Sequence, residues 1–390
     1  MSPLQVTGAG GSNFPGAEKA LADLTAQLTR TPYEVLVLRP LSGGNANFIF
    51  HAVLKTPLPD GTREVVIKHG EGFVAGNPDF KISTDRCQLI DEKEIEVLIL
   101  QKLTAFPPAR DGDWTVRTPK SIHFDPALRN HIQEYKPAAR SLKEYALDHF
   151  PTPTPSLESS CTSLGVALGK WLRSFHTWVN DKDQIHLREL AARNKQLQGI
   201  KQYINYGSLA SRIESFPDIL SDSKALLEEV GRATAQEIAD NDTLSVVHGD
   251  FWTGNVLLSE ESPAGDAPQR EVFVVDWEMF QLGIIPADIG QMIAELYELK
   301  LYKDLDAGLW IIKGFCSGYG AVDKDFAFRA LVTVGAHLLC FGTTVAGWGT
   351  PEQVEGVARE GRDILTAAWA KDEDFFKTHA LSCVLGSRAG

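Results

Sequence analysis

Residues 246–258, VVHGDFWTGNVLL, place a histidine, an aspartate and an asparagine between two apolar runs that are typical of strands. Buried polar groups cost free energy unless they are paired, so this cluster is either well satisfied or functional. A second strand-like run, EVFVVDWE at 271–278, ends with two more carboxylates, Asp276 and Glu278. The chemistry open to these side chains depends on how the two runs pair.

The two runs are expected to form an antiparallel hairpin, because the polar segment between them is rich in proline and glycine. In such a hairpin the beginning of the first strand lies beside the end of the second, so Asn255 is expected near Asp276. Asp250 lies on the loop just before, and Glu278 lies just beyond. Amide and carboxylate oxygens suit Mg²⁺, which binds few protein carboxylates and completes its shell with water and phosphate oxygens.

This set of oxygen ligands predicts a phosphoryl-transfer site. Asp250 is the expected base or hydroxyl-orienting group, because no other carboxylate separates it from Asn255. An alternative interpretation is that Asp250 and Asp276 only cap turns, as aspartates often do. The hairpin spacing and the Asp-Trp-Glu sequence after a β-rich run favour the functional interpretation.

The composition is that of an ordinary soluble globular protein, with 43% hydrophobic and 23% charged residues. The 390 residues are enough for two domains or one large bilobal unit. A formal net charge of -13 argues against general binding to nucleic acid or to an anionic membrane, since both need basic surfaces. Five scattered cysteines without a CxxC pair fit a reducing, cytoplasmic compartment. No pattern indicates an oligomeric state.

Two segments bear on targeting. Residues 1–16 lack a basic start followed by an apolar core, so a flexible tail is expected there rather than a signal peptide. Residues 330–348 carry no formal charge and are long enough to span a membrane. The glycines and threonines of this segment, together with His337, make it only moderately apolar. We therefore expect a buried helix of the larger domain and no membrane association.

Helical and strand-like patterns follow one another along the first third of the chain. A helical spacing at 17–30 precedes patterns for three strands, a helix and two further strands. These patterns cover residues 33–41, 41–54 with its Gly-Gly-Asn turn, 63–70, 91–103, 118–124 and 130–135. The order predicts an α+β fold. It has a smaller, ATP-binding lobe at 17–137 with an antiparallel sheet and one helix, and a larger, mainly helical catalytic and substrate-binding lobe at 138–390.

A strand-end lysine, Lys68, is expected to take part in nucleotide binding. It ends the third strand just before the helix, so a helical glutamate can pair with it and hold its ammonium toward phosphates. Glu96 is the expected partner because of its helical spacing from Leu100 and Leu103, while Glu92 and Glu94 remain open. The alternative is a solvated lysine at a strand end.

HGDFWTGN, followed by VVDWE and then PADIG, resembles the aminoglycoside phosphotransferase and choline kinase superfamily. The resemblance runs from about Leu41 to Trp369. The stretches LSGGNAN, VVIKHG and DFKI are similar to those of fungal small-molecule kinases such as 4-hydroxytryptamine kinase and, more distantly, methylthioribose kinase. The resemblance implies a bilobal protein-kinase-like fold. It also implies ATP- and Mg²⁺-dependent transfer of the γ-phosphate to a hydroxyl of a small metabolite, such as a hydroxylated amine or indole.

The resemblance also implies roles for single residues. Asp250 corresponds to the catalytic aspartate, Asn255 and Asp276 to the magnesium ligands, and Lys68 to the residue that contacts the ATP phosphates. Glu278 matches the second acidic residue of the methylthioribose kinase pattern and is an additional metal-ligand candidate. Methylthioribose kinase commonly has a serine at the position of Asn255, which argues against methylthioribose as the substrate.

The remaining nucleotide contacts are expected in a glycine-containing turn and in a connecting segment. Gly43 and Gly44, with Asn47, let backbone amides approach phosphates closely, although an ordinary hairpin turn has the same composition. By resemblance, QEYK at 133–136 corresponds to the hinge, so backbone groups of Glu134 and Lys136 are expected to meet adenine.

The partner is expected to be a small hydroxyl acceptor held by the larger lobe. Aromatic side chains give shape and cation-π contacts to an aromatic or amine substrate, while core packing is an equal alternative for each. The candidates are Trp252, Tyr297, His337 and Trp348. His248 and Asp288 are expected to hold the catalytic loop rather than to act on the substrate.

Three other functions are alternatives to this kinase. One is a methylthioribose-kinase-like sugar kinase, and another is a non-catalytic nucleotide-binding relative, against which the presence of all key residues counts. A third is a dinuclear metallohydrolase that uses His248, Asp250, Asp276 and Glu278. Such sites usually need several histidines, and His248 alone lies near the carboxylates in sequence.

Overall fold

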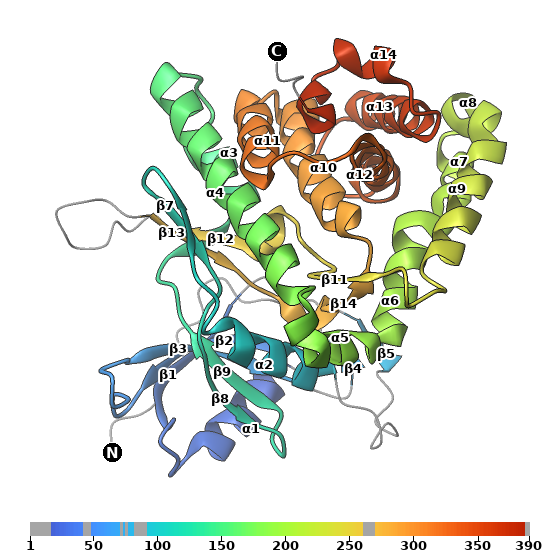
Figure 1. Ribbon diagram of the computed structural model, residues 1–390. Coiled ribbons are helices and arrows are strands. Elements are labelled where there is room, and N and C mark those ends of the chain that lie inside the picture. The colour runs from blue at the N-terminus through green and yellow to red at the C-terminus, as the bar shows by residue number, and fades with distance from the viewer. Residues whose placement is uncertain are drawn as a thin grey trace. The chain divides into compact units, whose positions relative to one another are not determined.

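The computed structural model describes residues 17–41, 48–70, 73–74, 77–81, 92–259 and 270–386. They divide into two compact units, shown as ribbons in Figure 1. The first unit contains the described residues up to Phe106 together with Thr118–Pro137. The second contains Pro107–Arg117 and the chain from Ala138 onward. The chain thus passes from one unit to the other at Pro137, near which a boundary was expected.

The first unit is built on an antiparallel sheet with the strand order β1-β2-β3-β9-β8. Its elements are α1 (Ala17–Leu28), β1 (Val35–Pro40), β2 (Phe48–Leu54), β3 (Glu64–His69), β4 (Phe73–Val74), β5 (Asn77–Lys81), α2 (Glu92–Leu103), β8 (Ser121–Asp125) and β9 (Asn130–Glu134). The expected three strands, helix and two strands are therefore confirmed, while the β4–β5 pair between β3 and α2 was not expected. The unit has α1 as a second helix, which the helical spacing at 17–30 had indicated.

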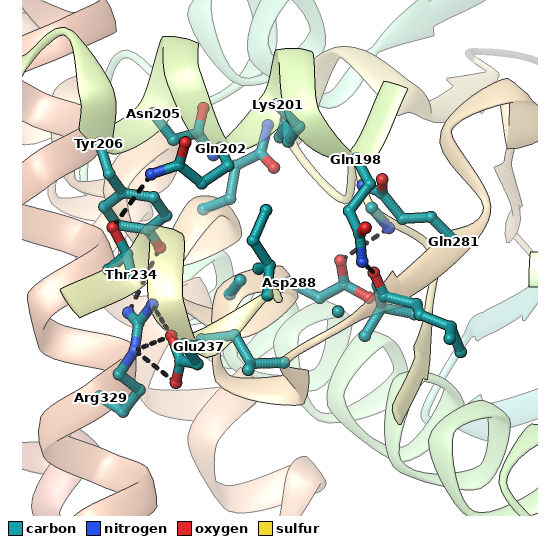
Figure 2. A pocket seen from close by; sticks show the side chains of 18 residues that line it. Gln198, Lys201, Gln202, Asn205, Tyr206, Thr234, Glu237, Gln281, Asp288 and Arg329 are labelled. Carbon is teal, nitrogen blue, oxygen red and sulfur yellow. Dashed lines mark hydrogen bonds and ion pairs between the residues drawn. The ribbon is translucent and has the colours of Figure 1, made fainter. Parts of the chain in front are cut away.

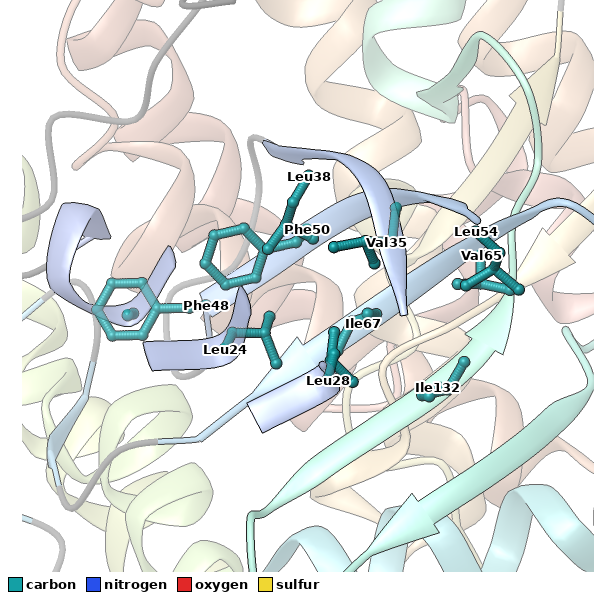
Figure 3. Close-up of a cluster of buried hydrophobic side chains, with 12 residues drawn as sticks. Leu24, Leu28, Val35, Leu38, Phe48, Phe50, Leu54, Val65, Ile67 and Ile132 are labelled. Carbon is teal, nitrogen blue, oxygen red and sulfur yellow. The ribbon is translucent and has the colours of Figure 1, made fainter. Parts of the chain in front are cut away.

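The core of this unit lies between α1 and one face of the sheet. Alternate residues of β2, from Phe48 to Leu54, are buried, as expected when successive side chains point to opposite faces. Leu24 and Leu28 of α1 pack in the same cluster as Ile67 of β3 (Figure 3). Because Lys68 follows Ile67 directly, its side chain points to the other face of β3.

Residues 107–117 form a hairpin that belongs to the second unit, although they were expected in the smaller lobe. The hairpin consists of β6 (Ala109–Asp111) and β7 (Trp114–Arg117), and β7 pairs in parallel with β13 (Arg270–Val274). Local patterns could not show this, because the pairing joins segments that lie far apart in the sequence.

The second unit contains a sheet of order β10-β12-β13-β7-β6, a two-stranded sheet of β11 and β14, and many helices. The strands not yet given are β10 (Ala139–Ser141), β11 (Ser245–Val247), β12 (Val256–Ser259) and β14 (Gln281–Gly283). The helices are α3 (Leu142–His149), α4 (Pro155–Val179), α5 (Ile185–Ala192), α6 (Lys195–Gln202), α7 (Arg212–Ser215), α8 (Pro217–Leu220), α9 (Lys224–Glu237), α10 (Ile285–Lys303), α11 (Asp306–Tyr319), α12 (Lys324–His337), α13 (Pro351–Trp369) and α14 (Glu373–Lys377). The α+β class and the mainly helical character of the larger unit are confirmed.

Helices α4 and α11 pack backbone against backbone. A Cβ atom on Gly165 would lie 2.1 Å from the carbonyl oxygen of Ile311, and one on Gly314 would lie 2.0 Å from that of Thr162. Glycine is therefore needed at both positions. The apolar face of α4 is fully buried, and its Trp171 stacks on Phe251 of the loop after β11, with ring centroids 6.3 Å apart.

One helical stretch in the described part of the chain, Lys324–Gly342, is long and apolar enough to cross a membrane. It consists of α12 and the π-helical turn Leu338–Gly342. Within its most apolar window 78% is buried inside the protein. This burial agrees with the core helix expected for this segment.

Candidate active site

The β12–β13 hairpin has the geometry expected from the sequence. The strands are antiparallel with Val256 opposite Val274, and the backbone N–H of Val275 donates to the carbonyl oxygen of Asn255 at 3.0 Å. Asn255 therefore lies beside the residue that precedes Asp276. The two proposed metal ligands come from adjacent backbone positions at one end of the hairpin.

His248 links the loop that carries Asp250 to the end of β13 through two hydrogen bonds. It is fully buried, its Nδ1 accepts from the backbone N–H of Asp250 at 3.2 Å, and its Nε2 donates to the carbonyl oxygen of Val275 at 3.2 Å. Burial lowers the pKa of His248, outweighing the nearby carboxylates that raise it. A neutral imidazole therefore holds the loop, which fits the architectural role expected of this residue.

Asp288 holds the same loop from the first turn of α10. Its Oδ2 accepts from the backbone N–H of His248 at 2.9 Å, and its Oδ1 accepts from that of Gly249 at 3.0 Å. Gly249 has a φ of 82°, and a Cβ there would lie 2.1 Å from the carbonyl oxygen of Met279. Both the conformation and the space thus require glycine at this position.

The carboxylate of Asp250 accepts hydrogen bonds on both oxygens. Lys201 Nζ donates to Oδ1 at 2.6 Å and Gln291 Nε2 donates to the same atom at 2.9 Å. On Oδ2, Trp252 Nε1 donates at 3.1 Å and Asn255 Nδ2 donates at 3.0 Å. Burial raises the pKa of Asp250, but the charge of Lys201 and the hydrogen bonds outweigh it and leave the pKa below its usual value. The group is therefore an oriented carboxylate at neutral pH.

The sequence did not indicate Lys201 and Gln291 as contacts of Asp250. Gln291 lies one helical turn after Asp288 on α10, so the three-residue spacing within PADIGQ could have indicated it. Lys201 lies on α6, 49 residues before Asp250, and no local pattern marks it. Only the tertiary packing of α6 brings the ammonium of Lys201 to the carboxylate.

Lys201→Gln is expected to change the pH dependence of kcat/KM. The fall in kcat/KM on the acid side should occur at a higher pH than in the wild type. The ammonium is the main group that opposes the effect of burial, so its loss raises the pKa of Asp250, and the ionised base is then lost at a higher pH. One charge-assisted hydrogen bond is worth about 1.5–3 kcal/mol, which corresponds to roughly tenfold or more in kcat/KM on the acid side. Steady-state kinetics from pH 5 to pH 9 measure this fall. A fall at the wild-type pH with reduced kcat would contradict this electrostatic role.

The residues at the end of the hairpin fit a magnesium ion. Both hydrogen bonds from the Asn255 amide use Nδ2, which leaves the amide oxygen as its metal-binding atom. Asp276 adopts a left-handed backbone conformation with φ 66° and ψ 68°, a strained state for a non-glycine residue that often accompanies function. Glu278 lies in the following turn, Trp277–Met279, and is half-buried. An amide and carboxylate oxygens are the donor set that Mg²⁺ prefers.

The first unit contains the expected lysine–glutamate pair. Lys68 Nζ lies 2.6 Å from Oε1 of Glu96, and both side chains are buried. Burial raises the pKa of Glu96, but Lys68 and His131 outweigh it, so the pKa lies below its usual value and the pair is ionic. Glu96 is thus the helical glutamate that contacts the lysine.

The other expected nucleotide contacts lie at the end of β9, in the connection after it, or outside the described residues. Glu134 ends β9, and its Oε2 accepts from the backbone N–H of Lys120 at 3.1 Å, while Lys136 follows in the connection to the second unit. Gly43, Gly44 and Asn47 lie outside the described residues. Their roles stay predictions.

Of the four candidates for acceptor binding, Trp252 is the one that contacts Asp250. Tyr297 donates to Glu360 at 2.7 Å, His337 lies 2.9 Å from Oε1 of Glu295, and Trp348 stacks on a neighbouring tyrosine. Each of these three is less than a tenth exposed. Their positions agree with core packing, the alternative that the sequence had left open.

A buried acidic cluster lies against the catalytic loop. Glu295 accepts from Thr253 Oγ1 at 3.1 Å and pairs with Lys143 Nζ at 2.6 Å. Burial raises the pKa of Glu295, but the hydrogen bonds and charges of His337 and Lys143 outweigh burial and lower the pKa to about 2. For Glu298, burial and the charge of Glu295 raise the pKa well above its usual value. Glu295 is therefore held as a carboxylate, while Glu298 binds a proton more readily than an ordinary carboxyl group.

The two acids of this cluster are expected to affect stability in opposite ways. Glu295→Gln should lower the free energy of unfolding at pH 7, because it removes the nearer of the two acids beside Lys143, with Glu295 at 2.6 Å and Glu298 at 3.6 Å. The loss should be smaller than the ~3–5 kcal/mol that a buried charge without any partner costs. The depressed pKa of Glu295 means that its stabilisation exists above the unfolded pKa and is lost as pH falls toward 2. The raised pKa of Glu298 means that its contribution exists at low pH and is lost as pH rises.

Glu298→Gln is the matched control for this prediction. A neutral amide cannot lose a proton, so this variant should equal or exceed the wild type in stability as pH rises from 5 to 8. Urea unfolding of both variants across that range measures the difference. Equal destabilisation by the two substitutions would contradict the assignment of the charges.

A pocket of the second unit is lined by two residues that donate to Asp250, although Asp250 itself is not a lining residue. It is lined by both donors to Asp250 Oδ1, Lys201 and Gln291, by Gly249, and by residues of α6, α9 and β14 (Figure 2). None of the four acceptor-binding candidates lines it. The sequence therefore did not indicate the wall of this pocket.

These features define a site with an oriented carboxylate, a lysine beside it and nearby amide and carboxylate oxygens of the kind that a hard cation prefers. A model of the phosphotransferase enzyme family (APH) matches residues 98–320, which is more than half of the chain. The chain therefore belongs to the phosphotransferase enzyme family.

Two curated relatives and a solved structure show similarity over most of the chain. Phosphotransferase FrzJ of Cladobotryum sp is 28% identical over 362 residues, covering 89% of this chain and 91% of the relative. The 4-hydroxytryptamine kinase of Psilocybe cyanescens is 21% identical over 337 residues, covering 83% and 85%. The GDP complex of aminoglycoside 2'-phosphotransferase-IIIa is 13% identical and covers 90% of this chain and 99% of its own, with a TM-score of 0.48.

Proposed function

We propose that this protein transfers the γ-phosphoryl group of ATP to a hydroxyl of a small metabolite. The observation that carries the proposal is the Asp250 carboxylate, which is ionised and held by four hydrogen-bond donors. Family membership supports phosphotransfer, and relatives that are named as small-molecule kinases support a small acceptor.

In the proposed reaction, the acceptor oxygen forms a bond to the γ-phosphorus while the bond from that phosphorus to the bridging oxygen of ADP breaks. Asp250 orients the acceptor hydroxyl and receives its proton. Lys68, positioned by Glu96, is assigned to the ATP phosphates. Asn255 and Asp276, with Glu278 as a further candidate, would hold Mg²⁺, which neutralises phosphate charge when bound.

The test is ADP release from Mg-ATP with a panel of hydroxylated amines, indoles, sugars, choline and aminoglycosides. Mass spectrometry of the product should show one added phosphoryl group on the acceptor, and the product should be absent with the Asp250→Asn variant. Binding of ATP without product across the panel would favour a non-catalytic relative. No ATP binding would contradict the proposal.

A further inference from the structure

One face of α10 contacts the loop that carries Asp250 at successive turns of the helix. Asp288, Gln291 and Glu295 follow one another at spacings of three and four residues, which places their side chains on the same face. Asp288 accepts from the backbone N–H of Gly249 at 3.0 Å. Gln291 Nε2 donates to Oδ1 of Asp250 at 2.9 Å. Glu295 makes the third contact, further along the loop.

The third contact joins Glu295 to Thr253. Thr253 Oγ1 donates to Oε2 of Glu295 at 3.1 Å. Thr253 is 0% exposed and Glu295 is 5% exposed, so bulk water does not compete for this hydrogen bond. A hydrogen bond to an ionised acceptor is roughly twice as strong as one between neutral groups. The contact therefore fixes the side chain of Thr253.

Glu295 is itself held from two other helices. Its Oε2 lies 2.6 Å from Nζ of Lys143 on α3, and its Oε1 lies 2.9 Å from Nε2 of His337 on α12. Burial raises the pKa of Glu295, but the hydrogen bonds and charges of these two residues outweigh burial and lower the pKa to about 2. Thr253 thus donates to a carboxylate that is ionised and held in place at neutral pH.

Thr253 and Asn255 belong to one short helical turn. The turn spans Thr253–Asn255, and the backbone N–H of Asn255 donates to the carbonyl oxygen of Trp252 at 3.0 Å. Since only Gly254 separates the two residues, a shift of Thr253 moves Asn255 as well. Nδ2 of Asn255 donates to Asp250, which leaves the amide oxygen of Asn255 as its metal-binding atom. The place of that oxygen therefore depends on Thr253.

We propose that Glu295 is a positioning residue for the magnesium site, because it sets the place of the Asn255 amide oxygen through Thr253. The inference rests on the proposed function and adds to it a residue that acts on the metal through two others. It also gives His337 a role. The sequence indicated His337 as an acceptor contact, whereas the structure makes it a partner of the Glu295 carboxylate. The alternative is that the bond between Thr253 and Glu295 only stabilises the fold.

Thr253→Val tests the inference, because valine keeps the branched shape of threonine and removes the donating hydroxyl. Isothermal titration with AMP-PNP, a non-hydrolysable ATP analogue, is made once with Mg²⁺ and once with EDTA. The ratio of the two dissociation constants gives the gain in nucleotide affinity that Mg²⁺ provides. In Thr253→Val this gain should fall by about tenfold, as is typical when a group that orients a metal ligand is lost. The affinity without metal should not change.

Product formation by the wild type separates the two proposals. If the gain is the same in the wild type and in Thr253→Val while the wild type phosphorylates an acceptor, the inference is overturned and the kinase function stands. If the gain falls in the variant and the wild type forms no product, the inference stands and the kinase function falls. A wild type that gains no affinity from Mg²⁺ would overturn the inference together with the magnesium assignment.

Two control variants separate positioning from a general loss of stability. Thr253→Ser keeps the hydroxyl and should keep the wild-type gain. Thr333→Val removes another buried hydroxyl, which lies 2.9 Å from the side-chain oxygen of Tyr206, and should lower thermal stability without changing the gain. Equal losses of the gain in the two valine variants would overturn the inference. If thermal unfolding shows that Thr253→Val does not fold, Thr253→Ala takes its place.

Hydrogen exchange of the loop gives a second readout that needs no nucleotide. In Thr253→Val the backbone N–H of Asn255 should exchange faster than in Thr253→Ser, because the turn is released from Glu295. The backbone N–H of Gly249, which Asp288 holds, should keep its wild-type rate. Equal acceleration of both N–H groups would contradict positioning through Thr253.

Discussion

Asp250→Asn is expected to lower kcat by roughly a hundredfold to ten-thousandfold while ATP binding is mostly retained. The substitution keeps the size of the side chain but removes the proton acceptor. It also leaves the ammonium of Lys201 beside an amide instead of the carboxylate that it now contacts at 2.6 Å. The effect should therefore fall on the chemical step rather than on nucleotide affinity.

Single-turnover kinetics and titration with Mg-ATP separate these two effects. Asp325→Asn is the matched control, because the Asp325 side chain is 79% exposed and pairs only at the surface with Lys371. The control should leave both kcat and ATP affinity near the wild-type values. A kcat above a tenth of the wild-type value in Asp250→Asn would argue that the carboxylate only caps a turn.

Asp276→Asn is expected to raise the Mg²⁺ concentration needed for half-maximal activity and to lower kcat/KM for Mg-ATP by roughly a hundredfold or more. A metal contributes several kcal/mol to stabilising transition-state charge, and about 1.4 kcal/mol corresponds to tenfold in rate. Asparagine is the informative substitution, since it tolerates the left-handed conformation that Asp276 adopts with φ 66°. The change thus removes charge with little added backbone strain.

Magnesium titrations of the wild type and the variant measure this effect, and Asp276→Ala provides a comparison. Alanine should lower both activity and thermal stability, because a left-handed alanine costs about 1–2 kcal/mol. The asparagine variant should lose activity but keep the thermal stability of the wild type. An unchanged magnesium midpoint in both variants would show that Asp276 does not bind the metal.

Much of this site could be predicted because its main residues lie on one hairpin. Alternating apolar residues and a turn-rich connection defined the two strands, and antiparallel pairing then required Asn255 to lie beside the end of β13. Lys68 and Glu96 were also predictable, since a strand end and the next helix place them within reach of each other. In each case the periodicity of an element determined which side chains share a face.

The tertiary structure decided what surrounds these residues. Lys201 on α6 and Gln291 on α10 reach Asp250 because the helices pack there, and β7 joins the second unit through a strand more than a hundred residues later. Likewise, the charge of Arg329 on α12 is compensated by Glu237 on α9, which is a contact between separate helices. The sequence by itself therefore determined the chemistry of the hairpin. Only packing between segments far apart in the sequence, which no local pattern encodes, determined the donors to Asp250 and the pocket that two of them line.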